Sequence, residues 1–205
     1  MKPTDFQALI FDMDGTIVNT VPTVLDCLKK ALAETGAEFD AKKLTSTLIG
    51  PPLEQMFETL CCSESSRKRA EVVAAFRRFY DAAPEKGTEL FRQIVPLLQT
   101  SVRKFIATNK PQKPALRLLD ALEISPLFEA VLTPDSGLNK AQMIAKIVAE
   151  NGLNPEKTLM IGDAVSDMTA AHAAGIKGVA VLWGYERDKE RLVSEADFIF
   201  EGKND

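Results

Sequence analysis

The chain has 205 residues, a formal net charge of −4 at pH 7 and a hydrophobic fraction of 45%. These values are typical of a globular protein with one large domain, or with one domain that carries an insertion. The acidic balance disfavours nucleic acid and membranes as partners, because proteins that bind them usually carry a basic patch. No apolar run is long enough for a membrane span, and no apolar leader is evident.

The cysteines indicate a reducing compartment. Cys27, Cys61 and Cys62 form an odd set in which two are adjacent, which is a poor disulfide framework. We therefore expect a cytoplasmic protein. The sequence leaves its oligomeric state open between a monomer and a small homo-oligomer.

The first expected strand lies near residues 6–11, and a segment of different character follows from about 18 to 84. Apolar residues recur in this segment at helical spacing, and no strand is expected in it. Gly50-Pro51-Pro52 breaks the chain within it. We therefore expect an all-helical unit at 18–84. We expect three helices in this unit: one that ends at Gly36, one at 53–60 and one at about 66–81.

Strands and helices alternate after residue 84. Such alternation implies a parallel sheet covered by helices on both faces. The expected fold class is α/β, with residues 1–17 and 85–205 as one domain and the helical segment inserted into it. The expected strands are 104–107, 130–132, 158–161, 179–182 and 198–200, and the expected helices lie near 88–99, 113–123, 139–151 and 165–174.

The most informative stretch reads Ala-Leu-Ile-Phe-Asp-Met-Asp-Gly-Thr at residues 8–16. A short buried strand delivers Asp12 and Asp14, and Gly15 lets the chain turn at once. The two carboxylates project from the same side if the strand stays extended. Like charges so close need a proton or a cation, and a magnesium ion held by few carboxylates and a phosphate meets that need. One aspartate could then attack phosphorus while the other transfers protons.

Further polar residues fall at the expected ends of other strands. Thr108-Asn109-Lys110 follows one strand and Gly162-Asp163 follows another, with Asp167 in the next helical turn and Lys140 near the start of another helix. Ligands of an open parallel sheet bind beyond the carboxyl ends of its strands. These groups would therefore converge on one crevice, where they supply what phosphoryl transfer requires.

Together these motifs resemble the haloacid dehalogenase superfamily, in the branch of phosphoglycolate-phosphatase-like enzymes. The resemblance spans essentially the whole chain, with four motifs in the expected order at 12–16, 108–111, 140 and 162–167. It implies a Rossmann-like parallel-sheet core with an α-helical cap inserted after the first strand. One departure is that Lys140 is followed by Ala-Gln, where the family more often has a Pro-rich stretch.

The resemblance also implies the role of each residue. Asp12 is the nucleophile that forms an aspartyl-phosphate, and Asp14 is the general acid and base, whose backbone carbonyl helps to hold magnesium. Asp163 is a metal ligand, and Asp167 supports the metal or Lys140. The turn at Gly50 is placed over the site. The expected site thus comprises catalytic Asp12, Asp14, Thr108 and Lys140, substrate-binding Thr108, Asn109, Lys140 and Gly50, and metal-binding Asp12, Asp14, Asp163 and Asp167.

These features predict a Mg²⁺-dependent phosphomonoester hydrolase that acts on a small phosphorylated metabolite, with phosphoglycolate as the first candidate by resemblance. A phosphosugar mutase would use the same Asp12, and a non-catalytic regulatory module is the alternative from another class. A dehalogenase is disfavoured, because Asp14 and the metal site serve phosphate chemistry. Cys61 and Arg67 match the Cys-x5-Arg spacing of cysteine-based phosphatases, but Glu64 lies between them and would repel a phosphate. The lone His172 is expected to be a structural or surface residue.

Overall fold

A computed structural model describes residues 5–49 and 53–202 of the chain. Six of its strands form one sheet in which every neighbouring pair is parallel. In sheet order these strands are β5 (Ala130–Leu132), β4 (Arg103–Ala107), β1 (Ala8–Phe11), β6 (Thr158–Gly162), β7 (Lys177–Val181) and β8 (Phe198–Phe200). The predicted α/β fold class is confirmed.

Strand β1 lies inside the sheet, and all four of its residues are buried. Leu9 and Phe11 belong to the apolar cluster on one face, whereas Ala8 and Ile10 belong to the cluster on the other. Such a continuous apolar run is typical of a parallel strand that is covered on both sides. The ladder places Ile10 opposite Phe105 of β4 and Met160 of β6, which extends the core across the sheet.

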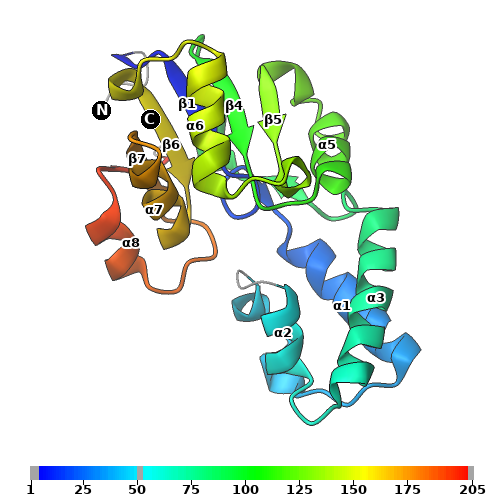
Figure 1. The fold of residues 1–205 in the computed structure, drawn as a ribbon. Coiled ribbons are helices and arrows are strands. Elements are labelled where there is room, and N and C mark those ends of the chain that lie inside the picture. Colours follow the sequence, from blue (N-terminus) through cyan, green and yellow to red (C-terminus); the bar gives the residue numbers. More distant parts are fainter. Residues whose placement is uncertain (1–4, 50–52, 203–205) are drawn as a thin grey trace. The chain divides into compact units, whose positions relative to one another are not determined.

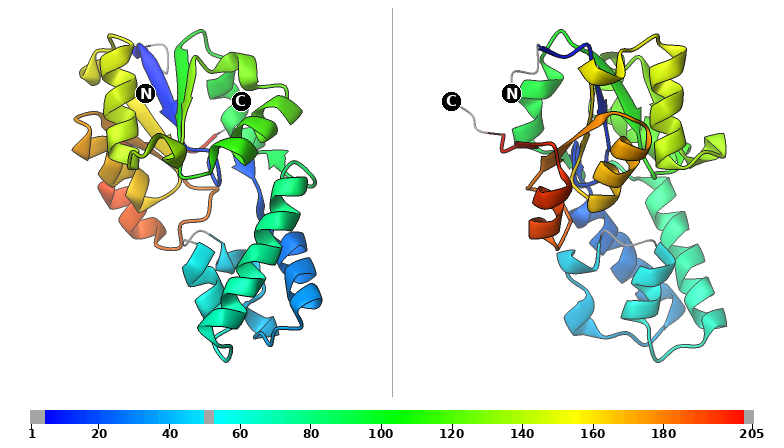
Figure 2. Two further views of the ribbon diagram at one scale, coloured as in Figure 1. Left: turned by 45° about the vertical axis from the view of Figure 1, so that its right-hand side comes forward. Right: turned by 60° about the vertical axis from the view of Figure 1, so that its left-hand side comes forward.

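Helices cover both faces of the sheet. The helices α6 (Lys140–Glu150) and α7 (Val165–Ala173) bury apolar residues in the cluster that contains Ile10. Figure 1 shows both in front of the strands, and the turned views of Figure 2 show α6 to one side of them. The helices α4 (Val95–Leu98) and α5 (Gln112–Ala121) contribute to the opposite cluster. No described helix is both long and apolar enough to cross a lipid bilayer.

The described residues form two compact units. Residues up to Asn19 and from Glu89 onward form the first, here called the sheet unit, and Thr20–Thr88 form the inserted unit. The expected division lay at 17/18 and 84/85, and the role of the inserted unit as a cap stays a prediction. Its main helices are α1 (Val21–Thr35), α2 (Leu53–Leu60) and α3 (Ser66–Ala82).

The inserted unit has its own apolar packing. Helix α1 packs along α3, and the ring of Phe76 lies 5.8 Å from that of Phe57 and 5.6 Å from that of Tyr80. Helix α1 ends as expected at Gly36, whose φ of 62° is left-handed and whose N–H bonds to Leu32 O at 2.9 Å.

Two expectations about secondary structure are wrong. Residues Val18–Asn19 form strand β2, which pairs antiparallel with β3 (Glu89–Leu90), so the segment 18–84 is not free of strands. The single helix expected at 88–99 is replaced by β3, a 3-10 helix and the short α4. Pro96 lacks a backbone N–H and fits only the first turn of a helix, so α4 begins at Val95. The helix α8 (Lys189–Glu195) was not expected.

Paired substitutions on α5 test the assigned core. Leu118 is 0% exposed and Leu116 is 37% exposed. We expect Leu118→Ala to lower the free energy of unfolding by about 2–5 kcal/mol through cavity formation. Leu116→Ala should change it by no more than about 0.5 kcal/mol. Urea unfolding followed by the fluorescence of Trp183, the one tryptophan of the chain, measures both. Equal losses in the two variants would contradict the assigned packing.

Candidate active site

Three adjacent strands of the sheet deliver polar residues at their carboxyl ends. Asp12 follows β1, Thr108 follows β4 and Asp163 follows β6, in the order β4-β1-β6. The backbone N–H of Asp12 bonds to Ile161 O at 2.9 Å, and that of Thr108 bonds to Leu132 O at 3.1 Å. The hydrogen-bond ladders of β1 and β4 thus continue one residue beyond each strand, so the backbones of Asp12 and Thr108 are held by the sheet itself.

Lys140 joins two of the acidic residues. Its Nζ lies 2.9 Å from Asp12 Oδ1 and 2.6 Å from Asp167 Oδ1, and all three side chains are buried. Lys140 is the first residue of α6, where a cation opposes the helix dipole. Its two carboxylate partners offset that cost. The helix start is secured by a capping box in which Asn139 and Gln142 bond to each other's backbone N–H at 3.0 Å.

Asp167 is fixed by its position in the first turn of α7. Its Oδ2 accepts the backbone N–H of Ala164 at 3.1 Å, so both oxygens of this carboxylate have partners. A carboxylate is favoured at a helix N-terminus. Gly162 leaves the room for it, because a Cβ at that position would lie 2.3 Å from Asp167 Oδ2.

Asp163 is held from four sides. Thr16 Oγ1 donates to its Oδ1 at 3.0 Å, and the backbone N–H of Tyr185 donates to its Oδ2 at 2.7 Å. A Cβ on Gly15 would lie 2.3 Å from Asp163 Oδ2, and a Cβ on Gly184 would lie 2.2 Å from Asp163 Cβ. Gly15 also has a φ of +85°, which its turn requires. The contacts of Tyr185 and Gly184 were missed in the sequence, although both follow a strand that ends at this edge.

Asp14 is separated from Asp12 by a change in chain direction. Strand β1 ends at Phe11, and Met13 O accepts the N–H of Ile17 at 2.9 Å, so the extended geometry assumed for the two aspartates is absent. Both carboxylate oxygens of Asp14 instead lie 3.1 Å from Lys110 Nζ. The sequence placed Lys110 at this sheet edge but did not predict this pairing.

The expected substrate-binding residues lie in different environments. Thr108 is buried and its Oγ1 accepts the N–H of Lys110 at 3.2 Å, whereas Asn109 is exposed. Gly50 lies outside the described residues. The structure therefore brings Asp12, Lys140, Asp163 and Asp167 into one cluster, with Thr108 on the neighbouring strand.

Burial dominates the ionisation of the cluster. It raises the pKa of Asp12 to about 6, with the charge of Asp167 adding to the rise and Lys140 opposing it. It raises the pKa of Asp163 to about 7, with the charges of Asp12 and Asp167 adding and the N–H of Tyr185 opposing. Burial alone would lower the pKa of Lys140, but the charges of Asp12 and Asp167 hold it above its ordinary value.

The cluster fits a divalent cation. Asp12, Asp163 and Asp167 each offer a carboxylate oxygen, and these oxygens lie within 4.8 Å of one another. Hard oxygen donors of this kind suit Mg²⁺. With all groups ionised, the three carboxylates and the ammonium of Lys140, which contacts two of them, leave two formal negative charges for a cation to neutralise. The Asp14 carboxylate is not part of this group.

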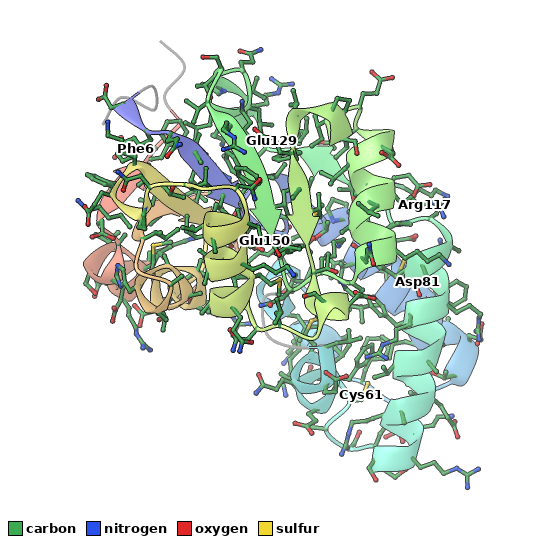
Figure 3. All side chains as sticks on the ribbon, turned by 45° about the horizontal axis from the view of Figure 1, so that its top comes forward. Phe6, Cys61, Asp81, Arg117, Glu129 and Glu150 are labelled. Carbon is green, nitrogen blue, oxygen red and sulfur yellow. The ribbon has the colours of Figure 1, made fainter. Side chains whose placement is uncertain are left out.

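The structure gives no support to a cysteine-phosphatase site. Cys61 lies in the inserted unit (Figure 3), its thiol is buried, and burial raises its pKa, which opposes a thiolate nucleophile. Arg67 is exposed and its Nε lies 3.6 Å from Glu71. His172 is also exposed, and its Nε2 lies 2.9 Å from Asp197 Oδ2.

The raised pKa values predict how a divalent cation changes stability with pH. Because the pKa of Asp12 rises from 3.8 to about 6 and that of Asp163 from 3.8 to about 7, the folded protein holds protons that the unfolded chain releases. The resulting stabilisation is complete below about pH 4 and is lost as pH rises through about 6–7. A bound cation replaces it, so we expect magnesium to raise the Tm more at about pH 8 than at about pH 5.

Thermal unfolding with and without magnesium at both pH values measures this difference. Asp163→Asn is the control, because it removes one donor and one titrating group. We expect magnesium to raise the Tm of this variant at about pH 8 by less than it raises the Tm of the unsubstituted protein. A larger rise at the lower pH in the unsubstituted protein would contradict the assignment.

Comparison with known proteins identifies the family. Residues 9–181 match the model of the haloacid dehalogenase-like hydrolases. The tyrosine-protein kinase PtkA of Mycobacterium tuberculosis is 32% identical over 200 residues, which cover 94% of this chain and 65% of PtkA. This chain therefore spans less than two thirds of that relative's length. The phosphoglycolate phosphatase of Photorhabdus laumondii is 30% identical over 210 residues, with 97% of this chain and 90% of that protein covered.

A solved structure agrees with this assignment. The haloacid dehalogenase-like hydrolase from Streptococcus pneumoniae superposes with a TM-score of 0.80 at 30% identity, and the match covers 96% of this chain and 94% of that one. The resemblance seen in the sequence motifs is thereby confirmed, including its phosphoglycolate-phosphatase-like branch. The chain belongs to the haloacid dehalogenase-like hydrolase family.

Proposed function

We propose that the protein is a Mg²⁺-dependent phosphomonoesterase that works through an aspartyl-phosphate at Asp12. The observation that carries this proposal is the contact of Lys140 with the buried Asp12 carboxylate, beside Asp163 and Asp167. Asp12 is a carboxylate held by a fixed cation beside two further carboxylates. Such a group can attack an anionic phosphate ester once a metal ion neutralises the negative charge of the cluster. A phosphoglycolate phosphatase among the relatives supports the same reaction.

Asp12 is the nucleophile in this proposal. A bond forms between its carboxylate oxygen and phosphorus, and the bond between phosphorus and the ester oxygen breaks. Lys140 holds Oδ1 of Asp12 at 2.9 Å and thereby restricts the orientation of the carboxylate. Such positioning lowers the entropy that must be lost on reaching the transition state.

Asp14 moves the protons. It donates one to the departing ester oxygen, then takes one from the water that attacks the phosphorus of the aspartyl-phosphate. Inorganic phosphate leaves, and both carboxylates return to their starting states. Lys110, 3.1 Å from both oxygens of Asp14, holds this carboxylate at the edge of the sheet. Positioned acid–base groups of this kind contribute about 10²–10⁴-fold to the rate.

The phosphoryl group needs donors and charge neutralisation. Thr108 and Asn109, at the end of β4 next to Asp12, would donate hydrogen bonds to its oxygens. Asp12, Asp163 and the backbone carbonyl of Asp14 would hold Mg²⁺, and Asp167 would support the ion or Lys140. When bound, that ion supplies positive charge for the developing negative charge on the phosphoryl oxygens.

We propose a small phosphorylated metabolite as the substrate, with phosphoglycolate as the first compound to test because a relative bears that name. The inserted unit, residues 20–88, would select it, because the acidic cluster lies wholly in the sheet unit. The acidic net charge of −4 favours neither nucleic acid nor a membrane as partner. A cytoplasmic monomer or small homo-oligomer remains our expectation.

The similarity to PtkA supports a second candidate, in which a tyrosine hydroxyl rather than water accepts the phosphoryl group. In a third candidate, a phosphosugar mutase, the same aspartyl-phosphate would return its phosphoryl group to a hydroxyl of the sugar. Incubation with labelled sugar phosphates or with ATP labelled in its terminal phosphate, in the presence of a tyrosine-containing peptide, separates the three: free phosphate indicates a phosphatase, phosphotyrosine in the peptide a kinase, and an isomeric sugar phosphate a mutase. We expect free phosphate.

Substitution of the two aspartates tests the assigned roles. We expect Asp12→Asn to abolish hydrolysis of p-nitrophenyl phosphate, because an amide is a poor nucleophile for phosphorus. Asp14→Asn should lower kcat by about 10²–10⁴-fold through loss of proton transfer. Asp120→Asn, at an exposed position on α5, is the matched control and should leave kcat unchanged. Turnover by Asp12→Asn at the unsubstituted rate would refute the mechanism.

The choice of metal provides an independent test. We expect magnesium to activate chelator-stripped protein and calcium to inhibit it. Magnesium prefers octahedral geometry at about 2.1 Å, whereas the larger calcium ion often binds a carboxylate through both oxygens. Engagement of both Asp12 oxygens would leave no lone pair directed at phosphorus. Steady-state rates with each ion alone and in competition decide the point, and equal rates with both would contradict the proposed geometry.

A further inference from the structure

The segment Trp183–Glu186, which follows β7, makes one hydrogen bond to the acidic cluster and two to residues near it in the sequence or in hydrogen-bond contact with it, all within the sheet unit. Trp183 Nε1 donates to Thr16 O at 3.1 Å, and the backbone N–H of Tyr185 donates to Asp163 Oδ2 at 2.7 Å. Glu186 Oε2 accepts the backbone N–H of Val165 at 3.1 Å. The roles proposed above do not use this segment.

We propose that the 183–186 segment positions the Asp163 carboxylate and the first turn of α7, and that Gly184 and Glu186 are the positioning residues on which magnesium affinity depends. The inference rests on the proposed function, since it concerns the metal that the acidic cluster would hold. Residues that orient metal ligands without touching the metal typically change its affinity by about 10–100-fold when they are substituted.

Gly184 acts through close approach. A Cβ at this position would lie 2.2 Å from Asp163 Cβ, 2.4 Å from Asp163 Oδ2 and 2.4 Å from Gly15 O. Rotation of the Asp163 carboxylate could relieve the contact with Oδ2, but Asp163 Cβ and Gly15 O are fixed to the backbone, so Asp163 or the turn at Gly15 would have to shift. Gly184 is not among the glycines with positive φ, so alanine is acceptable to its backbone and the substitution tests the contact itself.

Glu186 acts through the start of α7. Val165 is the first residue of that helix, and its N–H is among those that helical hydrogen bonding leaves unsatisfied. Glu186 satisfies it with Oε2, while its Oε1 accepts the N–H of Arg187 at 2.8 Å. One carboxylate thus joins the segment to the helix that carries Asp167, and its negative charge is favoured at that end of the helix.

Trp183 makes the segment observable. It is the one tryptophan of the chain, and its ring lies 6.3 Å from that of Phe91 and 6.0 Å from that of Phe200. Its indole donates to the backbone carbonyl of Thr16, whose hydroxyl donates to Asp163. Metal binding at Asp163 should therefore change the fluorescence of Trp183.

The experiment titrates chelator-stripped full-length protein with magnesium alone and measures Kd by calorimetry and by Trp183 fluorescence. We expect Gly184→Ala and Glu186→Ala to weaken binding by about 10–100-fold. Glu186→Gln, which keeps one acceptor oxygen, should give an intermediate Kd. The control is Gly175→Ala, because its φ of +75° makes alanine strained while no atom lies within 4 Å of the added Cβ. It should lower the Tm without changing Kd.

Activity supplies a second readout. If the segment only positions the metal ligands, hydrolysis of p-nitrophenyl phosphate by Glu186→Ala should recover at saturating magnesium. Should Gly184→Ala fail to fold, Glu186→Ala decides the question. A Kd for Glu186→Ala equal to that of the unsubstituted protein would overturn the inference and leave the proposed function intact. Absence of magnesium binding by the unsubstituted protein would overturn both.

Discussion

The ammonium of Lys140 lies between the carboxylates of Asp12 and Asp167, and the arrangement of the site depends on this contact. It joins the end of β1 to the first turns of α6 and α7. Removal of one member of a buried ionic cluster typically costs about 3–5 kcal/mol, because the charges left behind have lost both water and partner. The contact therefore holds Asp12, the proposed nucleophile, and also stabilises the local fold.

The parallel sheet explains why these charges can be gathered at all. The carboxyl ends of β4, β1 and β6 meet at one edge, so residues far apart in sequence become neighbours without any distortion of the strands. Buried carboxylates at this edge destabilise the fold, and the apolar clusters on both faces of the sheet offset that loss. The raised pKa values of Asp12 and Asp163 reflect the free-energy cost of burying their charged forms.

Much of this arrangement could be predicted from local patterns. Apolar runs located the six strands of the main sheet, and Asp12, Asp163 and Lys140 could be placed because each directly follows a strand or opens a helix. The ribbon of β2 and β3 was missed, because two-residue strands carry no periodicity. The single helix expected near 88–99 was wrong, because Pro96 fits only the first turn of a helix, and helix α4 is short.

The contacts that the sequence did not reveal are tertiary. Lys110 and Asp14 are 96 positions apart, and their pairing depends on a turn after β1 that the extended-strand assumption did not include. The requirement for glycine at position 184 arises from Asp163, which lies on a different strand end. Such close approaches depend on how the elements pack, and no local pattern encodes them.

In the proposed mechanism, Asp12 carries the phosphoryl group. The direct measurement uses Asp14→Asn with p-nitrophenyl phosphate, because its leaving group needs no proton while hydrolysis of the aspartyl-phosphate still requires a base. Acid quenching and borohydride reduction convert an aspartyl-phosphate to homoserine, which mass spectrometry locates. We predict homoserine at position 12. Modification at another residue, or an unmodified Asp12 in a variant that still releases a burst of p-nitrophenol, would contradict the account.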